Sequence, residues 1–220
     1  YEMLKGNPQI HLPECKEVHY WDKHADRPLQ WYRNHFKGGK VNGDITPAYG
    51  VLPEVGVAMV HTLTPEARLL FSLRHPIDRA WSFVQMEAAK AFATVPPDMI
   101  SGDPQGEHLA FVREKLFQPE WLARSDYATT IRRWRNLFGD EALMLFRYER
   151  IANEPRALLA DICRHIGVDP AWASELAQDV VRRTVFPSEK IPFPPALRKE
   201  FAERCAPYIA DLELLLGERF

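Results

Sequence analysis

The stretch from Ala67 to Lys90, ARLLFSLRHPIDRAWSFVQMEAAK, changes its hydrophobic period in the middle. Its first part, Leu69 to Leu73, is a short apolar run that is typical of a buried strand. Apolar residues then recur at helical spacing at Ile77, Ala80, Trp81 and Val84. The pattern predicts a strand that passes through a tight turn into a helix.

The turn between this strand and this helix has the features of an anion-binding site. Pro76 suits the first helical turn because its missing N–H would have no intrahelical partner there. The other donors at the helix start, together with the helix dipole, can hold an anion. Arg74 precedes the turn and Ser82 lies about one turn inside the helix, so a guanidinium and a hydroxyl could reach one phosphate. An ordinary junction with a surface arginine and a solvated serine is the alternative interpretation.

This segment resembles the 3′-phosphate-binding segment of sulfotransferases that use 3′-phosphoadenosine 5′-phosphosulfate (PAPS). The matching residues follow the apolar strand: Arg74, Pro76, Asp78, Arg79 and Ser82. The resemblance implies that Arg74 and Ser82 hold the 3′-phosphate of the nucleotide. It also implies PAPS as the sulfuryl donor, 3′,5′-diphosphoadenosine (PAP) as the product, and no metal.

The segment from Glu14 to Asp22 reads ECKEVHYWD, and its alternation predicts a strand with Glu17 and His19 on one face. It resembles the K-E-x-H-F-F-D motif of heparan sulfate sulfotransferases. The resemblance implies that Glu17 is the catalytic base and that His19 and Asp22 assist it or position the acceptor. Such a base is needed because a hydroxyl or amine that attacks sulfur must lose a proton. The alternative is a strand end with exposed charges.

Two further segments extend the likeness. The E-K-T-P-x-Y motif of the family is matched at Asp44, Thr46, Pro47 and Tyr49, while Ile45 occupies the position of its lysine. Lys190 corresponds to the basic residue of a late loop that closes over the nucleotide, although the K-G-R pattern is broken by Ile191.

The segment from Ser125 to Phe138 predicts an amphipathic helix with Asp126 or Ser125 as its cap. Ser125 stands where the family usually has glycine, two residues before the tyrosine that matches Tyr127. Arginines at 132, 133 and 135 in this helix predict a solvated face more readily than an anion-binding one.

The fold class expected from alternating strands and helices is α/β, with a mostly parallel central sheet flanked by helices. Beyond the central stretch, a second buried strand is predicted at Ala142 to Phe146. Further helices are expected at 53–63, 155–166 and 196–216, and an irregular stretch at 92–118 with a helix at 108–116. The resemblance implies the P-loop-like sulfotransferase fold.

Composition fits one domain over residues 1–220, because 46% hydrophobic content in 220 residues can bury a sizeable core. The net charge of −2 argues against a nucleic-acid binder. Cys15, Cys163 and Cys205 are scattered, which indicates neither a zinc site nor a disulfide framework and leaves one isolated disulfide open.

The chain start suggests an incomplete domain. Tyr1 opens in what resembles the end of a helix stopped by Gly6-Asn7-Pro8, and in the family the phosphate loop lies immediately before that helix. No apolar run could span a membrane and no signal peptide is visible, so a cytoplasmic location is expected.

These observations predict a PAPS-dependent sulfotransferase that acts on a hydroxyl or amine of a small-molecule or carbohydrate acceptor. Two other functions fit the same sequence. One is a P-loop nucleotide-kinase-like phosphotransferase, which needs a phosphate loop and magnesium ligands. The other is a non-catalytic ligand-binding domain on the same fold.

Overall fold

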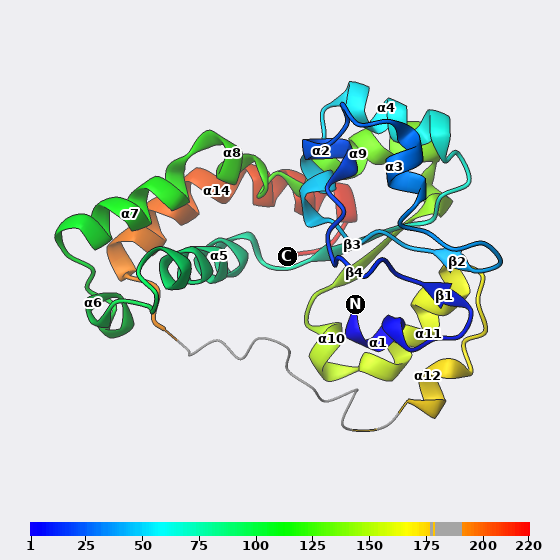
Figure 1. Ribbon diagram of the computed structural model, residues 1–220. Helices are drawn as coiled ribbons and strands as arrows, with labels where there is room; N and C mark the ends of the chain where they lie inside the picture. The colour runs from blue at the N-terminus through cyan, green and yellow to red at the C-terminus, as the bar shows by residue number, and fades with distance from the viewer. Residues whose placement is uncertain (177, 179–190) are drawn as a thin grey trace. The chain divides into compact units, whose positions relative to one another are not determined.

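The computed structural model describes residues 1–176, 178 and 191–220. The chain forms two compact units (Figure 1). Unit 1 comprises Tyr1–Leu73 and Arg132–Arg183, and unit 2 comprises Arg74–Ile131 and Thr184–Phe220. This division does not decide whether residues 1–220 form the single expected domain, so the single domain stays a prediction.

Unit 1 contains two pairs of parallel strands. In the longer pair, β3 (Leu69–Leu73) lies beside β4 (Leu143–Arg147), and Leu69 is in register with Leu143 (Figure 1). The shorter pair joins β1 (Ile10–His11) to β2 (Val41–Asn42). The strands expected at Leu69–Leu73 and Ala142–Phe146 and their parallel pairing are confirmed, but in the described residues the pairs form two separate two-stranded sheets.

The described part of unit 1 also contains short helices. They are α1 (Glu2–Lys5), α2 (Tyr20–Lys23), α3 (Leu29–Arg33), α4 (Glu54–Leu63), α10 (Arg150–Asn153), α11 (Pro155–His165) and α12 (Trp172–Glu175), with 3₁₀ turns η1 (Pro47–Val51) and η2 (Asp140–Ala142). The apolar face of α11 packs Leu159 and Cys163 against Ile10 of β1 and Ala173 of α12. At the end of α11, His165 Nε2 lies 3.1 Å from the Leu69 carbonyl and 3.2 Å from that of Ala142, so it links the starts of β3 and β4.

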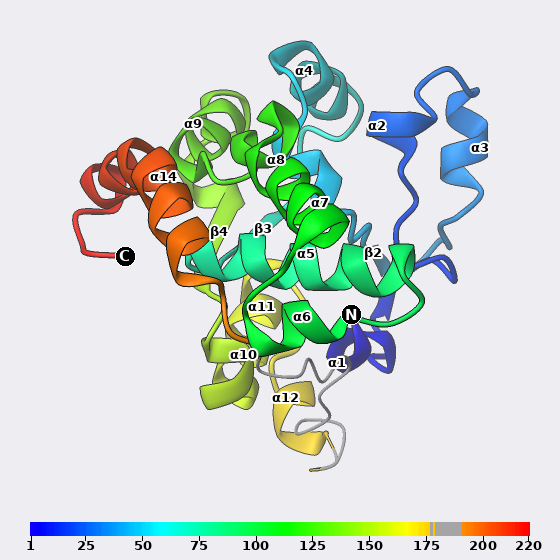
Figure 2. The ribbon, with the colours of Figure 1, turned by 90° about the vertical axis from the view of Figure 1, so that its left-hand side faces the viewer.

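The described part of unit 2 is built from helices and the loops between them. The helices are α5 (Pro76–Ala91), α6 (Pro97–Ser101), α7 (Gly106–Phe117), α8 (Pro119–Ala123), the start of α9 (Tyr127–Phe138), and α14 (Pro195–Leu216). Both α7 and α14 pack against α5 (Figure 2). The predicted strand-to-helix change at Arg74 is confirmed, and Pro76 is the first residue of α5.

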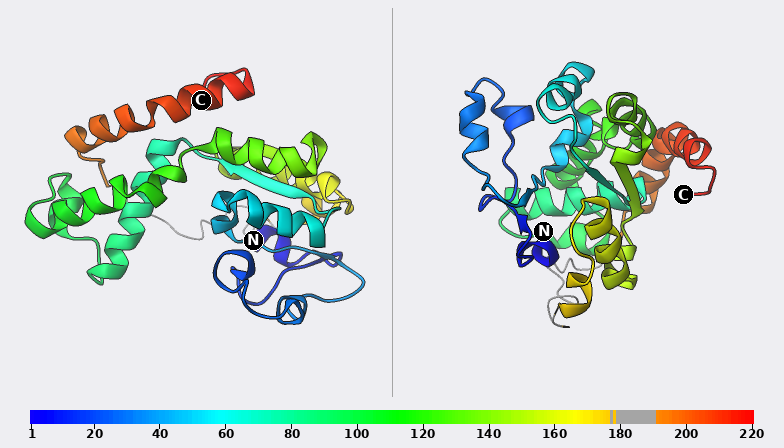
Figure 3. Two further views of the ribbon diagram at one scale, coloured as in Figure 1. Left: turned by 90° about the horizontal axis from the view of Figure 1, so that it is seen from above. Right: turned by 90° about the vertical axis from the view of Figure 1, so that its right-hand side faces the viewer.

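The core of unit 2 lies on one face of α5. Trp81, Val84 and Ala88 of this helix pack with Phe201 and Cys205 of α14, which is drawn in orange to red in Figure 3. The indole Nε1 of Trp81 donates to the Ile191 carbonyl at 2.9 Å. The long α14 therefore folds onto α5 through the apolar spacing that the sequence shows.

The stretch from Phe92 to Gln118 is more ordered than an irregular loop. It holds α6 as well as α7, and α7 begins at Gly106 rather than at His108. The carboxylate of Asp98 accepts the backbone N–H of Met99 at 3.0 Å and that of Gln105 at 2.9 Å, which orders the turn between the two helices. In the part of the chain that the structure describes, no helix is both long and apolar enough to span a membrane.

Candidate functional site

The first group of candidate residues surrounds the start of α5 in unit 2. Arg74 lies two residues before this helix and Ser82 lies in its second turn. Tyr127, the first residue of α9, donates its hydroxyl to the Arg74 carbonyl at 2.9 Å. The backbone of Arg74 is therefore anchored, while Arg74 and Ser82 flank the first two turns of a 16-residue helix.

A buried guanidinium supports this anchor. Arg79 donates from Nη2 to Ser125 Oγ at 3.0 Å, and Ser125 is only 1% exposed. Burial lowers the pKa of Arg79, while the nearby Tyr127 hydroxyl acts in the opposite direction. Ser125 replaces the glycine expected from the resemblance, and its hydroxyl supplies an acceptor for this buried cation. The sequence places Arg79 in the motif but carries no signal for its partner, which is 46 residues away.

The second group lies in unit 1, and here one structural expectation is wrong. Residues 14–19 form an irregular segment instead of the predicted strand, and α2 begins at Tyr20. His19 precedes this helix with φ 54° and ψ 28°, in the left-handed region. A left-handed residue turns the backbone out of the extended conformation, so the alternating sequence does not form a strand here.

The left-handed turn still brings the three predicted catalytic side chains together. His19 Nε2 lies 3.1 Å from Glu17 Oε2, and His19 Nδ1 lies 2.9 Å from Asp22 Oδ2. Lys23 Nζ is a further neighbour, at 3.3 Å from His19 Nε2. The side chains of Glu17, His19 and Asp22 are 36%, 20% and 17% exposed, so a substrate can reach Glu17.

This geometry gives the imidazole two different neighbours. A neutral His19 that donates its Nδ1–H to Asp22 presents the lone pair of Nε2 toward Glu17 and Lys23. In that form Nε2 can accept a proton that Glu17 has taken up. A protonated His19 would instead donate to both carboxylates and stabilise their charge.

A third group of residues is centred on Asp44 and is connected to the start of α2 by hydrogen bonds. Tyr49 Oη donates to Asp44 Oδ2 at 2.9 Å, Tyr32 Oη donates to the same oxygen at 3.2 Å, and Thr46 Oγ1 donates to Oδ1 at 2.7 Å. Tyr49 Oη also accepts the backbone N–H of Tyr20 at 2.9 Å. The E-K-T-P-x-Y likeness singled out Asp44 and Tyr49, but it carried no signal that they connect to α2.

The environment keeps both phenols protonated. Burial raises the pKa of Tyr49, and the charge of Asp44 raises it further. Burial and then Asp44 raise the pKa of Tyr32 in the same way. Each hydroxyl therefore remains a donor to Asp44 throughout the range in which enzymes normally work.

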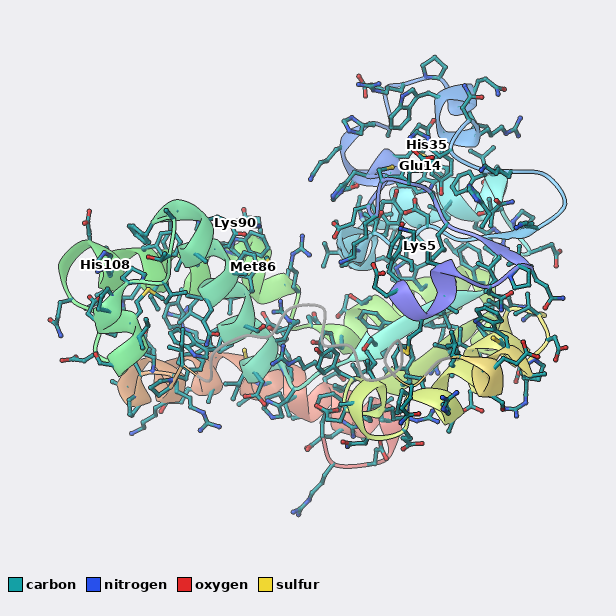
Figure 4. The ribbon with its side chains drawn as sticks, turned by 60° about the horizontal axis from the view of Figure 1, so that its bottom comes forward. Lys5, Glu14, His35, Met86, Lys90 and His108 are labelled. Atoms are coloured by element: carbon teal, nitrogen blue, oxygen red, sulfur yellow. The ribbon has the colours of Figure 1, made fainter. Side chains whose placement is uncertain are left out.

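Aromatic side chains around α2 and α3 pack this region. Tyr20 stacks on Tyr32 with ring centroids 4.7 Å apart, and His35, labelled in Figure 4, meets Trp31 edge-on at 4.6 Å. Arg27 lies over the ring of Trp31 at 4.6 Å. Trp31 and Tyr32 thus act as packing residues.

Other candidates lie apart from these groups. Lys190 is outside the described residues. Arg133 donates to the Leu52 carbonyl at 2.7 Å and Arg135 pairs with Asp140 at 3.1 Å, so both arginines bind protein groups. The cysteines are free thiols, with Cys15 exposed and the other two buried. Within residues 1–176, 178 and 191–220, no three His, Cys, Asp or Glu side chains gather as metal ligands do.

Comparisons with known proteins match this chain to sulfotransferases. The profile of the sulfotransferase domain family matches residues 4–191. Heparan sulfate glucosamine 3-O-sulfotransferase 6 of Mus musculus is 26% identical over 174 residues, which are 76% of this chain and 47% of that protein. The bifunctional heparan sulfate N-deacetylase/N-sulfotransferase 1 of Xenopus tropicalis is 25% identical over 123 residues, 54% of this chain and 13% of that protein. The chain therefore spans about half the length of the mouse relative and a smaller share of the Xenopus one.

A solved structure shares the fold. The sulfotransferase from Alicyclobacillus acidocaldarius superposes with a TM-score of 0.69 over 100% of this chain and 90% of that one, at 22% sequence identity. This likeness supports the α/β sulfotransferase fold that the sequence predicted.

Proposed function

The chain belongs to the sulfotransferase domain family, and on that premise we propose that it transfers a sulfuryl group from PAPS to a hydroxyl or amine acceptor. The observation that carries this proposal is the placement of His19 between the carboxylates of Glu17 and Asp22, at 3.1 and 2.9 Å. Matched relatives carry heparan sulfate in their names, which favours a carbohydrate acceptor.

Glu17 is the proposed general base. The acceptor hydroxyl or amine gives its proton to the Glu17 carboxylate as it forms the new bond to sulfur. Asp22 holds Nδ1–H of His19, so that Nε2 faces Glu17 at 3.1 Å and can share the proton. When bound, PAPS supplies the sulfuryl group, whose bond to the 5′-phosphate breaks as the bond to the acceptor forms.

The residues at the start of α5 fit the 3′-phosphate of that donor. A guanidinium at Arg74, a hydroxyl at Ser82 and the first turn of a 16-residue helix together offer positive charge and hydrogen-bond donors. The anchored backbone of Arg74 limits the entropy that is lost on binding. Lys190 is proposed as a further contact to the nucleotide on the strength of the resemblance alone.

The experiment that tests the nucleotide site is calorimetric titration with PAP and with AMP, which lacks the 3′-phosphate. We expect PAP to bind much more tightly than AMP, and Arg74→Ala to remove most of that preference. Arg113→Ala is the matched control, because Arg113 is an exposed arginine of the same unit that pairs with Glu200 at 2.8 Å. Equal losses for PAP and AMP in Arg74→Ala would contradict the 3′-phosphate assignment.

Transfer itself is tested with radiolabelled PAPS and two acceptors, a heparan sulfate oligosaccharide and a small phenolic alcohol. Label in the oligosaccharide alone supports the carbohydrate acceptor. Label in the phenol alone refutes it while retaining sulfuryl transfer. Magnesium-dependent ATP turnover without use of PAPS would favour the kinase-like alternative.

A further inference from the structure

His19 has a backbone conformation that is uncommon for any residue other than glycine. Among the described residues that carry a side chain, only His19 and Ala93 have a positive φ, at 54° and 62°. In this region the Cβ atom crowds the backbone, so surrounding contacts must hold the residue there. The contacts that do so decide whether the imidazole reaches Glu17 and Asp22.

One of these contacts comes from a distant part of unit 1. Tyr20 N–H belongs to the first turn of α2, whose donors have no intrahelical acceptor. The side chain of His19 makes no capping hydrogen bond there, and Tyr49 Oη accepts the Tyr20 N–H at 2.9 Å from 29 residues along the chain. The peptide that follows His19 is thus fixed by a phenol hydroxyl.

Asp44 sets the direction of that hydroxyl. Tyr49 donates its proton to Asp44 Oδ2 at 2.9 Å, which leaves an oxygen lone pair for Tyr20 N–H. Thr46 Oγ1 donates to the other carboxylate oxygen of Asp44 at 2.7 Å and holds it in place. The hydrogen bonds therefore form a connected series. Thr46 and Tyr49 both donate to Asp44, and the Tyr20 N–H donates to Tyr49.

We propose that Tyr49, oriented by Asp44, is a positioning residue that holds His19 in its left-handed conformation and keeps the group of Glu17, His19 and Asp22 assembled. The inference rests on the proposed function, in which Glu17 is the base. Among the described residues, Tyr49 Oη bonds to Asp44 and to the Tyr20 N–H and not to Glu17 or the His19 ring, so Tyr49 acts through the Tyr20 peptide.

The test is Tyr49→Phe, with Tyr32→Phe as the matched control. Both variants remove one phenol that donates to Asp44 Oδ2, but only Tyr49 also accepts the Tyr20 N–H. We expect kcat of Tyr49→Phe to fall roughly tenfold, the equivalent of one lost hydrogen bond. We expect PAP affinity to stay unchanged in both variants and kcat to stay near wild type in Tyr32→Phe. Equal kcat values for the two variants would overturn the proposal.

A second readout does not depend on sulfuryl transfer. NMR spectra of the His19 ring nitrogens and of the Tyr20 amide report the group directly. We expect Tyr49→Phe to move the Tyr20 amide signal and to change the pH titration of His19, whereas Tyr32→Phe leaves the His19 titration in place. An unchanged His19 titration in Tyr49→Phe would sink the positioning role even if Glu17 proves to be the base.

Asp44→Asn keeps the test decisive if Tyr49→Phe does not fold. It retains the phenol but replaces the acceptor of its proton with a side chain that has only one oxygen. The same loss of kcat and the same change of the His19 titration are expected, and wild-type values for both would contradict the proposal. Should Glu17→Gln retain full turnover, the base assignment fails by itself, and the NMR comparison still decides the positioning role.

Discussion

His19 joins two carboxylates that would otherwise repel each other. Its Nε2 and Nδ1 atoms lie within 3.1 Å of Glu17 and 2.9 Å of Asp22. An imidazole in this position can exchange a proton with one carboxylate while the other fixes its tautomer. In the proposed function the three side chains therefore have different roles although two are carboxylates, and Glu17 is the one expected to contact the acceptor.

Replacing Glu17 by Gln tests that division of roles. Gln cannot take a proton, so we expect kcat to fall about 10²-fold or more, the usual contribution of a general base. PAP affinity, measured by calorimetry, should stay at the wild-type value because the proposed nucleotide-binding residues Arg74 and Ser82 are unchanged. Full turnover by Glu17→Gln would remove Glu17 as the base.

Helix α9 shows how one element depends on its first residues. Tyr127 begins the helix and Asp126 precedes it, and Asp126 Oδ1 accepts the backbone N–H of Thr129 at 3.0 Å. This bond satisfies one of the donors that a helix start leaves unpaired. Since Tyr127 holds the Arg74 carbonyl, the cap also supports the proposed nucleotide site.

Replacing Asp126 by Ala should therefore lower the free energy of unfolding by about 1 kcal/mol, the typical contribution of an N-cap side chain. Urea unfolding followed by circular dichroism measures the change. The control is Asp26→Ala, because Asp26 is an exposed aspartate outside any helix. A loss no larger than that of the control would mean that the Asp126 bond does not stabilise α9.

The stability of the whole molecule in acid is linked to the turn between α6 and α7. Asp98 accepts N–H groups of Met99 and Gln105 and lies 2.9 Å from Nδ1 of His108, which is labelled in Figure 4. Burial raises the pKa of Asp98, but the bonds from the Gln105 amide, His108 and the Met99 amide together outweigh it and leave the pKa below its ordinary value of 3.8. A carboxyl with a lowered folded-state pKa stabilises the fold above its ordinary pKa.

This contribution should be lost as the pH falls through the folded-state pKa of Asp98, because the protonated carboxyl gains less from folding. We expect wild type to be more stable than Asp98→Asn near neutral pH and the difference to shrink below about pH 4. Urea unfolding of both proteins across this range measures it. A difference that is constant with pH would contradict the linkage, and Asp26→Asn controls for the loss of one charge.

The sequence by itself determined the elements whose pattern is local. The helical period of α5 and the apolar face of α14 bury their side chains as predicted, and Leu69–Leu73 forms the predicted strand, although only Leu73 of this strand is buried and Leu70 is exposed. Hydrophobic period fixes these elements because burial of one face outweighs the alternatives within the same stretch. The proximity of Glu17, His19 and Asp22 also follows from residues only five positions apart, although the strand expected there is absent and a helical turn takes its place.

Only the tertiary structure decided which distant groups hold the candidate site residues. Tyr49 reaches the peptide after His19 across 29 residues, Ser125 reaches Arg79 across 46, and Tyr127 reaches Arg74 across 53. No local period encodes such pairs, because a hydrogen bond between remote residues depends on how the elements pack and not on their own propensities. The left-handed turn at His19 belongs to the same class, because in our proposal the remote residues Tyr49 and Asp44 hold it in place.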